Sequence, residues 1–152
     1  MKKITIIGLI CLIAAYTQAQ ELKSTDVPII VRQAFASKFP KAVKVEWSKE
    51  SETEFEAEYK MNGMEMSSNF DQTGKWLVTE TEIKSSQFPA AIQAALKKDF
   101  MDYKIEESEK AETSGNEVFY EVALEKGKSN LEIKFATDGK IISKEEKKED
   151  KD

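Results

Sequence analysis

The residues of this chain most able to do chemistry are its glutamates. In residues 53–61 charged and apolar side chains alternate, and Glu54, Glu56 and Glu58 fall at the charged positions. A pair of carboxylates that flanks one substrate can act as general acid and base, as in glycosidases. Glutamates are spread along the whole chain, however, and no pair is set apart by an apolar or glycine-rich segment. A carboxylate-based hydrolase is therefore the weakest of the functions considered.

Other catalytic and metal-binding chemistry lacks its usual residues. The chain has no histidine and a single cysteine, Cys11, so the commonest general bases, nucleophiles and transition-metal ligands are missing. Asp71 and Asp138 lie in the segments DQTG and TDG, but neither segment has the alternating oxygen ligands and closing glutamate of a calcium loop. We interpret both segments as turns. We expect no enzymatic activity, no catalytic residue, no metal site and no cofactor.

The first 19 residues have the pattern of a secretory signal peptide. Two lysines precede an apolar stretch, and small residues lead to a cleavage site after Ala19. The stretch is shorter than the ~20 residues that span a bilayer, so no membrane span is expected after cleavage. Cys11 follows Ile10 and the apolar run continues beyond it, which does not fit a lipoprotein signal. The predicted location is the periplasm or the cell exterior.

Removing residues 1–19 would leave an acidic protein without cysteine. The removed segment contains two lysines, so its removal leaves 28 acidic and 21 basic residues, which is a net charge of −7. A disulfide is then impossible, and a packed core must supply the stability. Nucleic acid is not an expected partner, because binding its phosphates requires a basic surface.

Two helices are predicted, and they repeat along the chain. In residues 24–40, three cap candidates at 24–26 and a proline precede an apolar stripe at helical spacing, and Pro40 ends the helix. Residues 85–100 repeat this pattern, with Ser85 and Ser86 as cap candidates. Pro28 and Pro89, near the helix starts, are 61 residues apart, and so are Phe39 and Phe100, near the helix ends.

Strands are predicted after each helix. Alternation in residues 41–50 places Val43, Val45 and Trp47 on one side, and alternation in 53–61 is stricter. Tight turns follow at Asn62-Gly63 and at glycines 74, 127 and 139. The remaining strands are expected at 64–71, 75–84, 103–112, 116–125, 129–136 and 140–145.

The predicted fold class is α+β, built from two tandem repeats of one helix and a four-stranded antiparallel meander, with the helices on one face. The repeats cover about 24–84 and 85–143 within a domain of 20–143. The second copy is four residues longer before its last hairpin, and we expect the extra length in a loop at 110–116. Residues 144–152 are highly charged and are expected to be a disordered tail. Whether the two sheets join side by side is left open.

An ordered set of short motifs resembles a known family. The segments VPIIVRQAFASKFPKAVKVEW, FEAEYKMNGMEMSSNFDQTGKWLVTETEI and FPAAIQAAL are similar to the PepSY-like, β-lactamase-inhibitor-like (BLIP-like) periplasmic proteins. The resemblance covers nearly all of the chain after residue 19. It implies a secreted tandem α+β protein without an assigned reaction. A related inhibitor binds an enzyme with its concave sheet face, and PepSY domains are suspected of restraining peptidases. In the second repeat Ala136 and Ile141 replace Asp71 and Trp76.

The sheet face away from the helices is the expected binding surface. If the apolar side of residues 53–61 packs on the helix, the charged side points outward, and the second repeat adds more charge. We predict a non-enzymatic module that binds an envelope protein or peptidase through this acidic face. The alternatives are a solvated face that only keeps the protein soluble, and a periplasmic protein that binds a small molecule or cation. The candidate partner-binding residues are Glu46, Glu54, Glu56, Glu58, Lys60, Trp76, Glu121 and Glu132, with Lys44, Glu65 and Lys134 on the same face.

Overall fold

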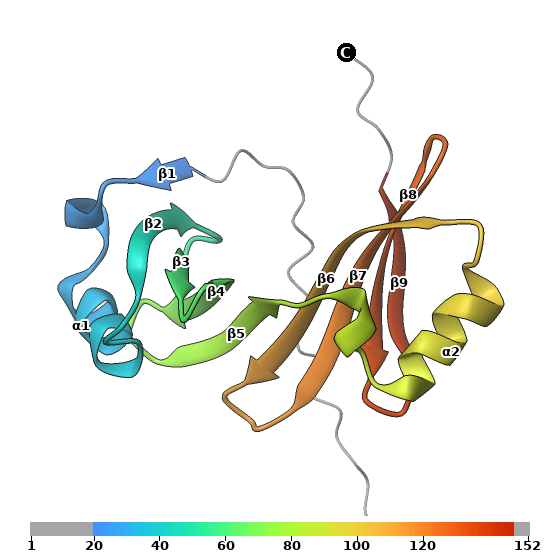
Figure 1. The fold of residues 1–152 in the computed structure, drawn as a ribbon. Helices are drawn as coiled ribbons and strands as arrows, with labels where there is room; N and C mark the ends of the chain where they lie inside the picture. The colour runs from blue at the N-terminus through green and yellow to red at the C-terminus, as the bar shows by residue number, and fades with distance from the viewer. Residues whose placement is uncertain (1–19, 148–152) are drawn as a thin grey trace, which may run out of the picture.

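The computed structural model describes residues 20–147 as one antiparallel sheet that carries two helices (Figure 1). The predicted signal peptide, 1–19, and residues 148–152 lie outside the described residues. No helix among the described residues is long and apolar enough to cross a membrane. The sheet has nine strands in chain order. The elements are β1 (Gln20–Leu22), α1 (Ile29–Lys38), β2 (Val43–Lys49), β3 (Glu54–Met61), β4 (Met64–Asp71), β5 (Trp76–Glu82), α2 (Ala90–Asp99), β6 (Lys104–Thr113), β7 (Val118–Lys126), β8 (Ser129–Ala136) and β9 (Ile141–Lys147).

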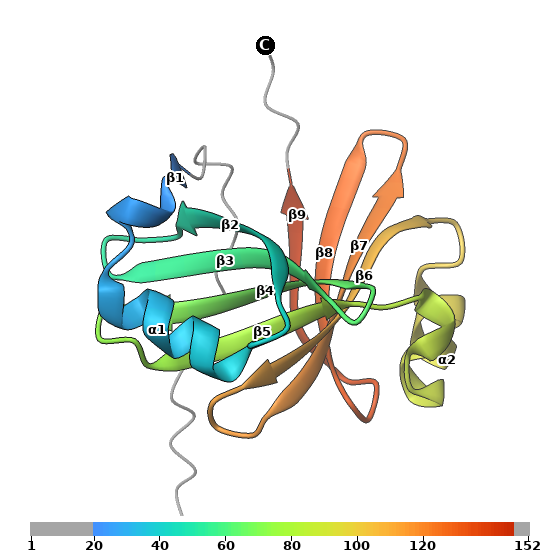
Figure 2. The ribbon, with the colours of Figure 1, turned by 60° about the vertical axis from the view of Figure 1, so that its left-hand side comes forward.

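Pairing between β5 and β6 joins the two halves into a continuous sheet. The two predicted sheets therefore do join side by side. The paired residues run from Val78 opposite Thr113 to Glu82 opposite Glu109. The sheet twists strongly, so that β2–β5 and β7–β9 run in different directions in Figure 2. An additional strand, β1, pairs with β2 at one edge and was not predicted.

Both helices lie on the same face of this sheet. Six residues that lie opposite one another on successive strands form a row on one face of the sheet. This row runs from the aromatic side chains beneath α1 to those beneath α2. Tyr59 at one end contacts Phe35 and Phe39, and Tyr120 near the other end contacts Phe88. The row consists of Tyr59, Met66, Thr81, Lys110, Tyr120 and Phe135.

The two helices begin later than predicted. Residues Ser24–Asp26 and Ser85–Gln87 form separate 3-10 turns. The N-cap residues are Pro28 and Pro89, whose extended ψ angles of 137° and 145° separate each turn from its helix. The predicted capping by Ser24, Thr25, Asp26 and their counterparts is therefore wrong, because proline blocks helical geometry in the residue before it.

A β-bulge overturns the predicted face of Val43 and Val45. The register of β2 against β3 shifts between Val43 and Glu46, and Lys44 takes the left-handed φ of 55°. A bulge inserts one residue and breaks the alternation of side chains. Val43 and Val45 are consequently 58% and 36% exposed, whereas Trp47 is buried.

Two segments predicted to be irregular are strands. The predicted strand 103–112 and the predicted loop 110–116 overlap, and residues 110–113 belong to β6: residues 110–112 pair with both β5 and β7, and Thr113 pairs with Val78. Strand β6 has ten residues against seven in β2, so most of the extra length of the second repeat lies in the strand that joins the halves. Residues 144–147 belong to β9, where they pair with residues 130–133 of β8. The tail prediction is wrong for 144–147, because the backbone of these charged residues continues the antiparallel ladder with β8.

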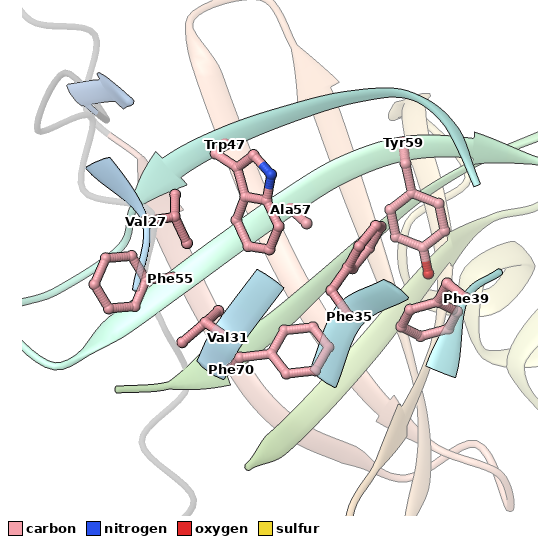
Figure 3. Packing of buried hydrophobic residues seen from close by; sticks show 9 residues of the cluster. All are labelled: Val27, Val31, Phe35, Phe39, Trp47, Phe55, Ala57, Tyr59 and Phe70. Carbon is pink, nitrogen blue, oxygen red and sulfur yellow. The ribbon is translucent and has the colours of Figure 1, made fainter. Parts of the chain in front are cut away.

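The first core is an aromatic cluster beneath α1 (Figure 3). The Phe35 ring is at its centre, with ring centroids 5.0 Å from Tyr59, 5.3 Å from Trp47 and 6.1 Å from Phe70. The buried polar groups of this region pair with one another. The Tyr59 hydroxyl bonds Ser68 Oγ at 3.0 Å, and Ser68 Oγ bonds Thr79 Oγ1 at 2.7 Å. The buried members are Val27, Val31, Phe35, Phe39, Trp47, Phe55, Ala57, Tyr59 and Phe70.

The second core repeats the first with more aliphatic side chains. Leu96 of α2 stands 61 residues after Phe35, and Phe135 of β8 stands 65 residues after Phe70. Phe70 and Phe135 are both fully buried. The buried members are Phe88, Ile92, Leu96, Phe100, Val122, Leu124, Leu131, Ile133 and Phe135.

The two matching G-K hairpins pack against the first turns of the helices. Gly74 and Gly139 have φ of 83° and 84°. A Cβ on Gly74 would lie 2.9 Å from the Ile30 carbonyl oxygen, and one on Gly139 would lie 2.8 Å from that of Ala91. The repeated glycine thus lets a turn approach a helix backbone in each half, besides allowing the left-handed φ.

Replacing Gly139 by alanine should therefore lower the free energy of unfolding by about 2 kcal/mol, through the left-handed φ and the close backbone contact. Gly127 is the matched control, because it has φ +63° and open space around its Cβ position. The Gly127→Ala variant should lose only about 1 kcal/mol. Urea denaturation of both variants measures the difference, and equal losses would contradict the packing role.

Candidate functional site

The candidate site is the sheet face opposite α1 and α2, called here the open face. Cross-strand register places seven of the eight predicted partner-binding residues on it, since each alternates with a core residue on its own strand. Glu58 is exposed, and Glu56 is half-buried and accepts a hydrogen bond from Ser48 Oγ at 3.2 Å. Lys60 forms an ion pair with Glu65. The seven residues are Glu46, Glu54, Glu56, Glu58, Lys60, Glu121 and Glu132.

Trp76, the eighth predicted residue, lies on the helix side, so its assignment to the open face is wrong. It packs against the first core, and its Nε1 donates to Thr79 Oγ1 at 2.9 Å. A bulge explains this placement, because Asn69 pairs with Val78 while Phe70 pairs with Trp76. The inserted residue places Trp76 and Thr79, three positions apart, on one face.

Because of the same bulge, two acidic residues of β5 also lie on the open face. They were not among the predicted partner-binding residues. Glu80 lies opposite Ser67 of β4, and Glu82 lies opposite Glu109 of β6. Glu109 in turn lies opposite Glu121 of β7. The alternation of threonine and glutamate in residues 79–82 was the signal that these carboxylates share one face. The junction of the two halves is thereby the centre of the acidic surface.

Glu80 and Glu109 are the most strongly perturbed groups of the open face. Burial raises the pKa of Glu80 to about 7, with repulsion from Glu121 and Glu56 adding to it, although Ser67 Oγ donates to Glu80 Oε2 at 3.2 Å. Burial also raises the pKa of Glu109 to about 8, with repulsion from Glu80 as the next cause. Each carboxylate therefore holds a proton for part of the time at neutral pH.

A single buried cation stands among these carboxylates in the described part of the chain. Lys134 is 8% exposed, and its Nζ lies 2.7 Å from Glu121 Oε1. The same ammonium lies 4.0 Å from the centroid of the Phe119 ring. One lysine cannot neutralise the glutamates of three neighbouring strands, which is why burial and repulsion still raise the pKa of Glu80 and Glu109.

A hollow of about 400 Å³ opens on this face. Lys44 and Lys60 contribute the basic side chains of its lining. No group of three or more histidine, cysteine, aspartate or glutamate residues within 20–147 is arranged to hold a metal ion. The arrangement suits cationic groups presented by a larger molecule, which can contact several separated carboxylates at once. The acidic residues that line the hollow are Glu46, Glu58, Glu65, Glu82, Glu107 and Glu109.

A family model described as beta-lactamase-inhibitor-like, PepSY-like matches the chain twice, over residues 15–68 and residues 60–143. The two matches overlap: the first ends within the first predicted repeat, and the second begins in β3 and runs through the second predicted repeat. No curated protein matches the chain.

Solved structures of low sequence identity share the fold. A protein from Bacteroides eggerthii, described as periplasmic, is 19% identical with a TM-score of 0.74, covering 79% of this chain and 88% of that one. A DUF2874 family protein from Bacteroides uniformis is 21% identical with a TM-score of 0.73, covering 78% and 88%. A BLIP-like protein from Bacteroides fragilis is 20% identical with a TM-score of 0.68, covering 81% and 88%.

Proposed function

The chain belongs to the beta-lactamase-inhibitor-like, PepSY-like family, and on that premise we propose that it is a secreted, non-enzymatic module that binds a basic envelope protein through its open face. A location in the periplasm or outside the cell is supported by the signal-peptide pattern of residues 1–19 and by the periplasmic description of the Bacteroides eggerthii neighbour. The BLIP-like description of another neighbour supports an inhibitor-like role.

The excess of acidic over basic side chains around Glu80 and Glu109 carries this proposal. Both residues are half-buried and their carboxylates repel one another, and burial together with this repulsion raises both pKa values. Lysine or arginine side chains of a partner would favour the ionised carboxylates and release this repulsion. Because the charges extend over several strands, they would also speed the encounter and select basic partners.

A charge-reversal experiment tests this role. The purified protein is immobilised, a cell-envelope extract is passed over it, and the retained protein is identified, purified and titrated. We expect the double variant Glu56→Lys and Glu58→Lys to bind this partner at least tenfold more weakly. Binding to the unsubstituted protein should also weaken as salt is added, because exposed charges are screened.

A matched control separates the open face from net charge. The double variant Glu52→Lys and Glu117→Lys changes the net charge equally, but both residues are exposed outside the strands. It should retain the partner almost fully. Equal retention by the two double variants would contradict docking on the open face. Binding of a cation instead of a protein would raise the melting temperature in millimolar calcium.

A further inference from the structure

A groove lies on the helix side of the sheet, on the opposite face from the proposed docking surface. It encloses about 410 Å³ between the C-terminal end of α1 and strand β6. Met66, Thr81 and Lys110 line it, and they are the middle of the cross-sheet row that runs from the first core to the second. The groove therefore lies between the two hydrophobic cores, with Phe39, Met66 and Trp76 of the first core and Ile83 of the second in its lining.

The lining of this groove is mainly apolar and is held in place. Phe39, Met66, Trp76 and Ile83 provide ring, thioether and aliphatic surface. The hydrogen bond from Trp76 Nε1 to Thr79 Oγ1 fixes the orientation of the indole. A volume of this size and character falls in the range of small-molecule sites, about 300–1,000 Å³.

A lysine without a carboxylate partner stands over the apolar lining. Lys38 Nζ lies 3.6 Å from the centroid of the Trp76 ring and 5.7 Å from that of Phe39. Among the described residues its ammonium forms no ion pair, whereas Lys110 is paired with Glu112 at 2.5 Å. The groove thus carries one uncompensated positive charge in an acidic protein.

We propose that this groove binds a small apolar molecule with one anionic group, such as a carboxylate or sulfonate. The hydrocarbon part would lie on Met66, Trp76 and Ile83, and the anionic group would pair with Lys38 at the rim. A cationic ligand fits poorly, because Lys38 already occupies the face of the indole and would repel it. This site is independent of the proposed function, since it lies on the other face of the sheet.

Tryptophan fluorescence tests the site with defined probes. The chain has two tryptophans, and Trp47 is buried in the first core whereas Trp76 lines the groove. Dodecanoate below its micelle concentration should change the fluorescence in a saturable manner, and the Trp76→Phe variant should lose that change. Dodecyltrimethylammonium should bind at least tenfold more weakly than dodecanoate.

Variants of Lys38 separate charge recognition from general apolar binding. Lys38→Gln should weaken dodecanoate about tenfold without affecting uncharged dodecanol, and Lys38→Arg should restore dodecanoate binding. Lys38 is exposed, so these variants should fold normally, as far-UV circular dichroism can verify. The double variant Glu56→Lys and Glu58→Lys should bind dodecanoate normally. An unsaturable response, equal affinity for the cationic probe, or unchanged dodecanoate binding by Lys38→Gln would overturn the proposal.

Discussion

Replacing Phe70 or Phe135 by alanine should lower the free energy of unfolding by about 3–5 kcal/mol in each case. Both side chains are 0% exposed and occupy equivalent positions in the two cores. The loss combines the transfer of a large apolar group with the cavity that remains after its removal. Urea denaturation, followed by circular dichroism and by fluorescence, measures both values.

The fluorescence of the Phe135→Ala variant also tests whether the two halves unfold together. Both tryptophans, Trp47 and Trp76, belong to the first half. The β5–β6 pairing makes the sheet continuous, so we expect the tryptophan signal to shift to lower urea although the substitution lies in the second core. A fluorescence transition that stays at its original midpoint while circular dichroism shifts would mean that the halves unfold separately. Ile142→Ala, at a 56% exposed position, is the control and should cost less than about 0.5 kcal/mol.

The repeated pattern of the sequence allowed the helices, the tight turns and most core residues to be predicted. Asn62 and Gly63 both take positive φ, as the two-residue hairpin requires. Trp47 and Tyr59 are buried, as their alternation with core residues indicated. These features depend on residues close in sequence, where periodicity and turn chemistry act directly.

Features that depend on pairing between strands could not be predicted in this way. The bulge at Lys44 exposes two valines, and the bulge before Val78 reverses the faces of β5. A bulge changes the side-chain parity of every residue beyond it, and no composition signal marks either one. For the same reason, Glu56 and Glu58 were assigned to the open face from local alternation, whereas Glu80 and Glu109 required the register across the junction.

Replacing Glu109 by glutamine should stabilise the protein at high pH and have little effect at low pH. Because burial raises the pKa of Glu109 from 4.5 to about 8, the folded state binds more protons than the unfolded state between these values. The contribution of this carboxyl to stability is therefore fully present below pH 4.5 and is lost as the pH rises through 8. Glutamine is neutral throughout and avoids the loss.

The expected gain at pH 9 is on the order of 2–4 kcal/mol, from roughly 1.4 kcal/mol per pKa unit reduced for the remaining solvent contact. Urea denaturation of both proteins at pH 4.5 and pH 9 measures it. Glu52→Gln removes a carboxylate that is 97% exposed and pairs with Lys49 only at the surface, so it should give a difference that varies by less than about 1 kcal/mol with pH. A constant difference for Glu109→Gln would show that the carboxylate is not held in a repulsive, desolvated position. The electrostatic basis of the open-face proposal would then be lost, because a basic partner would have no buried repulsion to relieve.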